Sequence, residues 1–278
     1  MQSIQLELID EDIINHKIDH VKLILSNKKV IIAFSGGVDS SVLAFLAKQF
    51  CQQVLLVMQD GYSIGIGEIE YATKIARFLN LKLEFLYYNE YEISENYAEN
   101  PDNRCYYCKE ILHQELEKLR VTNGFDLVLN GTNASDLKGH RPGYQAVQEK
   151  GAYTPLVDAN LSKSEIRWIA KNHHLPVWDK PATACLASRF KTGIRITKER
   201  LQRVAEAEYF IKSNYHVNVL RVRDDGSSAR IEVGIDEMWK LKDNIIFIEI
   251  EAKLFDLGFN KVTLDKKGYR SGVLGGVE

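Results

Sequence analysis

The chain lacks an apolar run long enough to span a bilayer, and neither sign of charge dominates it. Its 36 lysines and arginines nearly balance 38 aspartates and glutamates, so no overall field favours nucleic acid or an anionic membrane. Repeats and low-complexity segments are also missing, and the acidic N-terminus lacks the layout of a signal peptide. These absences, with 45% hydrophobic and 27% charged residues, favour a cytoplasmic globular protein that has no nucleic-acid or membrane partner.

Cysteine is scarce, with four residues in 278: Cys51, Cys105, Cys108 and Cys185. In a reducing cytoplasm thiols stay free, so clustered cysteines indicate metal binding or catalysis rather than disulfides. Cys51 lies alone in an apolar-flanked segment, and we interpret it as a bystander. The other three are candidates for chemistry.

A strand, a glycine turn and a helix follow one another between residues 30 and 47. Val30 to Phe34 is short, apolar and β-branched, which is typical of a buried parallel strand. Gly36 and Gly37 let the backbone approach a phosphate, and the helix that begins near Ser40 directs free N–H groups and its positive dipole end at the turn. The turn matches neither the P-loop nor the dinucleotide fingerprint, yet it predicts an anion site.

The stretch Ser35-Gly-Gly-Val-Asp-Ser-Ser41 resembles the PP-loop of the ATP pyrophosphatases, which cleave ATP between the α and β phosphates. The alternative is an ordinary Gly-Gly turn in an α/β sheet. The resemblance implies that Asp39 helps to hold Mg²⁺ and that pyrophosphate is held by Ser35, Gly36, Gly37, Asp39, Ser40 and Ser41.

Hydrophobic periodicity predicts a doubly wound parallel α/β sheet over residues 1–190 and a second, smaller α/β domain over residues 191–278. The first part has expected strands at 30–34, 54–58, 83–87 and 126–130, with helices at 10–27, 68–79 and 107–120. Ser162 is the expected N-cap of a further helix, with Glu165 in a capping box. In the second part we expect helices at 198–213 and 236–257, strands at 217–223, 229–234 and 261–265, and a glycine-rich tail.

Two loops are expected to face the crevice beyond the strand ends, where doubly wound sheets bind ligands. Gly131, Thr132 and Asn133 follow one strand, and a simple turn with an Asn cap is the alternative. Arg221 and Arg223 alternate along another strand and therefore share one face. That face either binds an anion or is merely solvated.

Cys105 and Cys108 lie at the entry to a helix, where the helix dipole, Arg104 and Lys109 are expected to favour thiolates. Three functions compete for these thiols. They are a redox C-x-x-C pair, a zinc site completed by Cys185 and His113, and an iron–sulfur cluster held by Cys105, Cys108 and Cys185.

An ordered set of short motifs is spread along the chain, and the resemblance that it carries extends from about residue 15 to residue 276. Together with the PP-loop it resembles the LarE family, the ATP-dependent sulfur transferases that build the nickel-pincer nucleotide cofactor of lactate racemase. The motifs are Arg104-Cys-Tyr-Tyr-Cys-Lys109, Gly131-Thr-Asn-x-x-Asp136, Arg141-Pro-Gly143, Ala184-Cys-Leu-Ala-Ser-Arg189, Arg221-Val-Arg223, Ala229-Arg-Ile-Glu232 and Asp265-x-x-Gly-Tyr-Arg-Ser-Gly272.

This resemblance implies that the enzyme adenylates a carboxylate of pyridinium-3,5-biscarboxylic acid mononucleotide, releases pyrophosphate and forms a thiocarboxylate. Some members sacrifice the sulfur of one cysteine, at the position of Cys185. This chain has three cysteines, which implies a 4Fe–4S cluster on Cys105, Cys108 and Cys185, with Cys185 not consumed. The implied cofactors are ATP, Mg²⁺ and that cluster, and the implied assembly is a homo-hexamer.

The same resemblance places further residues on substrate phosphate or on the catalytic face: Lys109, Ser188, Arg189, Glu208, Arg221 and Arg223. Three other functions compete with the sulfur transferase. A tRNA thiolase normally carries an RNA-binding module, for which the chain has neither a basic stripe nor a spare domain. An NAD-synthetase-like amidase would leave the cysteines idle, and a nucleotide sensor would release no pyrophosphate.

Overall fold

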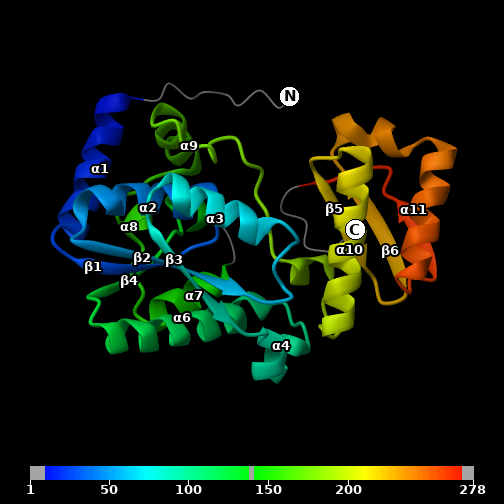
Figure 1. The fold of residues 1–278 in the computed structure, drawn as a ribbon, viewed down its shortest axis with the longest axis horizontal. Helices are drawn as coiled ribbons and strands as arrows, with labels where there is room; N and C mark the ends of the chain where they lie inside the picture. Colours follow the sequence, from blue (N-terminus) through cyan, green and yellow to red (C-terminus); the bar gives the residue numbers. More distant parts are fainter. Residues whose placement is uncertain (1–9, 138–140, 271–278) are drawn as a thin grey trace.

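The computed structural model describes residues 10–137 and 141–270 (Figure 1). Most of the predicted glycine-rich tail, with the last two residues of the terminal motif, and residues 1–9 lie outside the described residues. Within the described ranges no helix combines the length and the apolar character needed to cross a membrane.

The first sheet is entirely parallel, as predicted, with the strand order β3-β2-β1-β4. The chain runs outward from β1 to β3 and then returns to place β4 on the other side of β1. The carboxyl ends of β1 and β4 therefore flank a switch point of the kind at which doubly wound sheets bind ligands. The strands are β1 Lys29–Ala33, β2 Gln53–Asp60, β3 Lys82–Tyr87 and β4 Leu127–Asn130.

Helices cover both faces of this sheet (Figure 1). Val30 and Ile32 of β1 pack toward α1, α2, α3, α8 and α9, whereas Ile31 packs toward α6, because successive side chains alternate across a strand. All three side chains are fully buried, and each contributes about 1.5–3 kcal/mol of hydrophobic stabilisation. The helices are α1 Glu11–Leu25, α2 Val38–Phe50, α3 Glu68–Phe78, α6 Arg104–Asn123, α7 Pro142–Glu149, α8 Pro155–Asp158 and α9 Lys163–Asn172, with the short α4 Glu90–Ile93 and α5 Glu95–Ala98 between β3 and α6.

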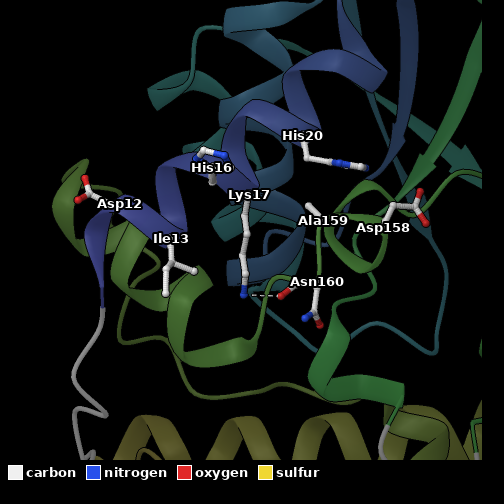
Figure 2. A pocket seen from close by; sticks show the side chains of 8 residues that line it. All are labelled: Asp12, Ile13, His16, Lys17, His20, Asp158, Ala159 and Asn160. Carbon is white, nitrogen blue, oxygen red and sulfur yellow. Dashed lines mark hydrogen bonds between the residues drawn. The ribbon is translucent and has the colours of Figure 1, made fainter.

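Lys17 fastens α1 to the rest of this layer. Figure 2 shows its ammonium reaching from α1 to the carbonyl oxygen of Asn160 at 2.7 Å, beside a hollow of about 510 Å³. The same ammonium pairs with Glu165 of α9 at 2.7 Å. Glu165 also closes the predicted capping box with Ser162, so this prediction is confirmed.

The second sheet has three strands in the order β5-β6-β7, with β5 antiparallel and β7 parallel to β6. These strands are β5 Leu220–Asp224, β6 Ser228–Val233 and β7 Lys261–Leu264, and they pack with α10 Lys198–Tyr215 and α11 Asn244–Asp256. The prediction of one helix over 236–257 is wrong. A 3₁₀ segment, η3 Ile235–Leu241, ends first, and Asp243 then caps α11 by accepting N–H bonds from Ile245 and Ile246.

The two parts of the chain are joined by more than the connecting segment. Asn100 donates its side-chain amide to the carbonyl of Lys191 at 2.8 Å and accepts the N–H of Gly193 at 2.9 Å. Tyr97, from the first part, lies in the hydrophobic cluster of the second. A domain division at residue 190 stays a prediction.

Candidate active site

The phosphate loop between β1 and α2 requires glycine at Gly36. Its φ is +65°, in the left-handed region, and a Cβ there would lie 2.8 Å from both the Cα and the Cβ of Ala72 on α3. Gly37 is the N-cap of α2 and supplies no side chain to close the helix end. The loop thus presents backbone rather than side chain at the positive end of α2.

Two hydroxyls shape the loop from within. Ser40 donates to the carbonyl of Gly37 at 3.2 Å and accepts the N–H of Ser35 at 3.3 Å, while the two serine oxygens lie 3.2 Å apart. Ser41 differs, because it is fully buried and its hydroxyl has no hydrogen-bond partner within the described ranges. The role of Ser41 in holding pyrophosphate stays a prediction.

The loop after β4 packs directly on the start of α2. A Cβ at Gly131 would lie 3.0 Å from the backbone nitrogen of Ser40, so a side chain there would push this loop away from α2. Asn130 accepts from the N–H and hydroxyl of Thr132 at 3.0 and 2.7 Å, and its amide nitrogen therefore donates to Nε2 of His113 at 3.1 Å. Burial lowers the pKa of His113 to about 3, with Lys109 adding to the effect, so the ring is neutral.

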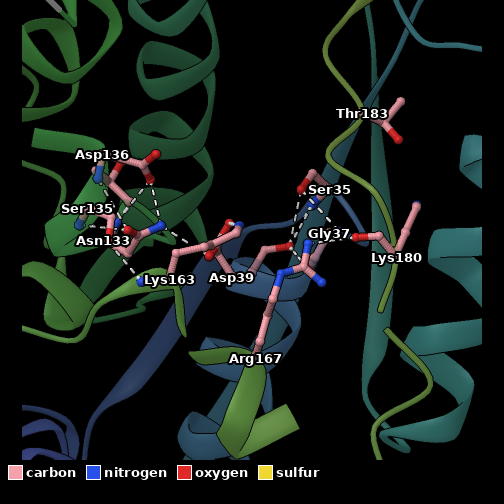
Figure 3. A network of polar contacts seen from close by, with 12 residues as sticks. Ser35, Gly37, Asp39, Asn133, Ser135, Asp136, Lys163, Arg167, Lys180 and Thr183 are labelled. Atoms are coloured by element: carbon pink, nitrogen blue, oxygen red, sulfur yellow. Dashed lines mark hydrogen bonds and ion pairs between the residues drawn. The ribbon is translucent and has the colours of Figure 1, made fainter. Parts of the chain in front are cut away.

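Asp39 belongs to a polar network that joins three stretches of chain (Figure 3). Asn133 donates to Asp39 at 3.1 Å and to Asp136 at 2.7 Å. Lys163, at the start of α9, pairs with the other oxygen of Asp39 at 2.5 Å. The predicted residues Asp39 and Asn133 therefore meet, and Lys163 joins them although sequence reasoning had given it no site role.

One cavity of about 380 Å³ connects this network with two of the cysteines. The phosphate loop contributes Ser35, Asp39 and Ser40 to its wall, and the loop after β4 contributes Gly131 and Thr132. Cys108, Lys109 and Cys185 line the same cavity. The anion cradle and the candidate sulfur carriers thus share one chamber, which is the geometry that ATP-driven sulfur transfer requires.

Cys108 is not the thiolate that the sequence suggested. Burial, and then the nearby Glu90, raise the pKa of Cys108 well above its ordinary value. Burial also raises the pKa of Cys185, although Arg104 opposes the shift. Desolvation therefore outweighs the helix end and its cations at Cys108 and Cys185. Cys105 is exposed, and Cys51 is half-buried with a pKa raised by burial to about 12.

Unsatisfied polar atoms surround the buried thiols. Glu90 is 1% exposed and accepts from Ser63 at 3.0 Å and from the Cys108 thiol at 3.6 Å, yet its second oxygen has no partner among the described residues. The hydroxyls of Tyr88 and Tyr97 are likewise buried and unpartnered there. In residues 10–137 and 141–270 no group of three or more His, Cys, Asp or Glu side chains is arranged to hold a metal ion.

Three buried arginines hold the segment 182–188, which carries Cys185, by its backbone carbonyls. Arg189 donates to two of them at 2.7 and 3.1 Å. Arg221 and Arg223, both on β5, donate to the first and the last carbonyl of the segment at 2.9 Å each. Arg221 is 7% and Arg223 5% exposed, so the alternative of a solvated strand face is wrong.

Ser188 and Glu208 support the same segment. The hydroxyl of Ser188 donates to the carbonyl of Cys185 at 2.8 Å. Glu208 accepts two bonds from Arg189, at 2.8 and 3.0 Å, and a third from the N–H of Val222 at 3.0 Å. These contacts position Cys185. That Ser188, Arg189 or Glu208 touches substrate stays a prediction.

Comparison with known proteins places this site in a family. A family model described as asparagine synthase matches residues 20–110. The chain is 38% identical to an uncharacterised protein of Synechocystis sp., over 88% of this chain and 91% of that protein. It is 30% identical to the pyridinium-3,5-bisthiocarboxylic acid mononucleotide synthase of Lactiplantibacillus plantarum, over 88% of each chain.

The chain belongs to the LarE family. It is therefore a PP-loop ATP-dependent sulfurtransferase. A tRNA-specific 2-thiouridylase of Aliarcobacter butzleri is more distant, at 28% identity over 55% of this chain and 51% of that protein.

The LarE motifs converge at the first turns of α6. A Cβ at Gly143, in the Arg-Pro-Gly motif, would lie 3.3 Å from the carbonyl oxygen of Cys105 and from Cγ of Lys109. Glycine at this position therefore allows α7 to pack against the turn that carries Cys105 and Cys108. Among the residues that sequence reasoning missed, Lys163 and Glu90 carry no local signal, because each meets its partner only through the fold.

Proposed function

We propose that this chain uses ATP to adenylate a carboxylate of pyridinium-3,5-biscarboxylic acid mononucleotide and then converts that carboxylate to a thiocarboxylate. The relative from L. plantarum is named for the bisthiocarboxylic product. One observation carries the proposal: Cys108 and Cys185 line the same cavity as Ser35, Asp39 and Ser40. A carboxylate bound between them would meet the α-phosphate of ATP on one side and the sulfur on the other.

The chemistry has two balanced steps. A carboxylate oxygen attacks the α-phosphorus of ATP, and pyrophosphate leaves with the electron pair of the broken P–O bond. A sulfur nucleophile then forms a C–S bond at the acyl carbon, and AMP leaves as the C–O bond breaks. Adenylation is needed because a free carboxylate has a poor leaving group, whereas AMP is a good one.

The phosphate loop and its neighbours would bind the leaving pyrophosphate. Backbone N–H groups at the start of α2 and the ammonium of Lys163 supply positive potential where charge develops. The donor set fits Mg²⁺, because Asp39 and Asp136 bring two carboxylates to one cavity wall, bridged by Asn133. In that role the two aspartates would hold the ion, and Lys163 would be released from Asp39 toward the phosphates.

The three cysteines are proposed to hold a 4Fe–4S cluster. Three cysteine thiols are the ligands that such a cluster takes, and they lie near one another, since Cys105 acts on the pKa of both Cys108 and Cys185. Cys105, Cys108 and Cys185 would be the ligands, and Arg104, itself 7% exposed, would offset the negative charge. When bound, such a cluster leaves one iron free to take an additional sulfide.

A homo-oligomer, a hexamer by family resemblance, is proposed as the assembly. Large apolar side chains are exposed on η3 and α11 and would be covered in it: Ile235, Trp239, Ile245, Ile248 and Phe255. Light scattering on the purified chain tests this, and a monomer at micromolar concentration would contradict it.

The decisive experiment measures AMP and pyrophosphate release from ATP with and without the dicarboxylate mononucleotide. We expect release that depends on the mononucleotide and a product heavier by the exchange of oxygen for sulfur. The protein is purified anaerobically and analysed for iron and sulfide, with Cys105→Ala as the test variant and Cys51→Ala as the matched control. Loss of the mass of H₂S from Cys185 after a single turnover, in a protein without iron, would overturn the cluster and favour a sacrificial cysteine.

A further inference from the structure

One buried carboxylate, that of Glu90, has no cation beside it. Within residues 10–137 and 141–270 four carboxylates are buried, and three of them pair with arginines: Glu208 with Arg189, Glu232 with Arg223 and Asp224 with Arg203. Glu90, the fourth, is 1% exposed, and no basic side chain in those ranges forms an ion pair with it.

The carboxylates that line the ATP cavity show the same contrast. Three of them pair with a basic side chain: Asp39 with Lys163 at 2.5 Å, Glu68 with Lys180 at 2.9 Å and Asp136 with Arg141 at 3.2 Å. Glu90 lines this cavity too. Lys109, another residue of the wall, makes no ion pair with Glu90 in the described part of the chain. The wall therefore carries one carboxylate that lacks a partner, next to Cys108.

Hydrogen bonds hold Glu90 by one oxygen only. Its Oε1 accepts from the hydroxyl of Ser63 at 3.0 Å and from the thiol of Cys108 at 3.6 Å. Ser63 is itself buried, and the amide of Gln59 donates to its hydroxyl at 3.4 Å, so the carboxylate is held in place. The second oxygen, Oε2, has no partner among the described residues. A buried acceptor of this kind is costly unless a ligand satisfies it.

The negative charge of Glu90 acts on the groups around it. Burial, and then Glu90, raise the pKa of both Cys108 and Tyr97 well above their ordinary values. The potential beside these groups is therefore negative. Because burial removes the water that would otherwise offset the charge, a cation that entered the cavity at this point would be bound favourably.

The proposed substrate supplies such a cation. Its ring nitrogen carries a positive charge, whereas the phosphates of ATP and the other ionised groups of the mononucleotide are anionic. Each carboxylate of the substrate is attached directly to the ring. A carboxylate that lies next to Cys108 for sulfur transfer would therefore bring the ring next to Glu90, whose Oε1 is 3.6 Å from the Cys108 sulfur.

We propose that Glu90 binds the positively charged pyridinium ring of the substrate and selects it over an uncharged ring. The proposal rests on the proposed function. Away from water a contact between opposite charges is strong, so the charged ring gains affinity. An uncharged ring would leave the buried carboxylate without compensation, which adds to the discrimination.

The experiment compares two ligands, the dicarboxylate pyridinium mononucleotide and its 1,4-dihydro form, which keeps both carboxylates and the phosphate but has an uncharged ring. Their binding to the full-length protein is measured by calorimetry, without ATP, for wild type, Glu90→Gln and Glu90→Asp. Glu92→Gln, an exposed site on the same α4, is the control for lost charge. We expect wild type and this control to bind the pyridinium form about tenfold or more tightly than the dihydro form. Glu90→Gln should bind both forms equally, and Glu90→Asp, which keeps the charge, should retain most of the preference.

The absence of a cation beside Glu90 can be tested without any ligand. Glu90→Gln keeps an acceptor for Ser63 and leaves no cation unpaired, so its urea midpoint should not fall below that of wild type. Glu208→Gln is the matched buried site, where the change leaves Arg189 unpaired and should lower the midpoint. An equal loss of stability in both variants would overturn the assignment, because Glu90 would then have a partner within the protein.

The binding data can overturn it as well. Wild type that binds the two forms equally, or binds neither, would do so, as would a preference that Glu90→Gln retains. A preference that depends on Glu90, found without pyrophosphate release, would support the ring site and refute the proposed function instead. Pyrophosphate release that depends on the mononucleotide, found without any preference for the charged ring, would support the proposed function and overturn the role of Glu90.

Discussion

Replacing Arg189 with glutamine should lower the free energy of unfolding and the turnover, and it should leave the affinity for ATP unchanged. Arg189 is 1% exposed, and its two bonds to Glu208, at 2.8 and 3.0 Å, lie in the interior. Removing one partner of a buried ion pair leaves an uncompensated charge and costs about 3–5 kcal/mol. That is a large part of the total stability of a typical protein, which is about 5–15 kcal/mol.

The matched control is Arg195→Gln. Arg195 pairs with Glu95 in a similar two-bond arrangement, but their side chains are 54% and 64% exposed. Exposed pairs are screened by water, so we expect almost no change in the urea midpoint for this control. A second variant, Arg189→Gln with Glu208→Gln, removes the stranded charge while keeping an acceptor for the N–H of Val222. It should recover about 1–3 kcal/mol relative to the single variant.

The assay is urea unfolding followed by circular dichroism, with ATP binding and turnover measured on the folded fraction. Because Arg189 also holds two carbonyls next to Cys185, we expect turnover to fall while ATP affinity is kept. The reasoning is refuted if Arg189→Gln destabilises no more than Arg195→Gln, or if the double variant is as unstable as the single one.

Three further outcomes follow from single sites. Lys163→Met should raise the KM for ATP about tenfold, because it removes the cation paired with Asp39. Steady-state kinetics measure this, with Lys171→Met as the control, and an unchanged KM for Lys163→Met would contradict the prediction. Gly36→Ala should lower the thermal midpoint and abolish protection by ATP, since its Cβ would lie 2.8 Å from Ala72 at φ +65°. Gly124→Ala is the control, because Gly124 has a φ of +66° but no atom within 4 Å of the added Cβ. It should lower the thermal midpoint and keep protection by ATP. Loss of this protection in both variants, or in neither, would contradict the predicted clash at Gly36. His113 has a pKa of about 3 in the folded chain and 6.5 as its ordinary value. The unfolded state therefore binds more protons between these values, and stability should fall by about 2 kcal/mol from pH 6.5 to 5. Urea midpoints of wild type should show this loss and those of His113→Gln should lack it, whereas parallel profiles would disprove the assignment.

Much of the fold could be predicted because it depends on local pattern. The apolar run of β1, the turn at Gly36 and Gly37 and the helix period of α2 are all readable within about twenty residues. The capping box of Ser162 and Glu165 was predicted for the same reason. The break between η3 and α11 was missed, because continuous helical periodicity hid the capping signal of Asp243.

The sequence by itself determined the chemistry on offer: a phosphate loop, three cysteines and a set of arginines in an ordered series of motifs. Only the tertiary structure decided which groups meet. Lys163 reaches Asp39 across 124 residues, and Glu90 of α4 accepts from the Cys108 thiol of α6. Burial likewise decided that Cys108 is a thiol, since desolvation depends on neighbours that no local pattern specifies.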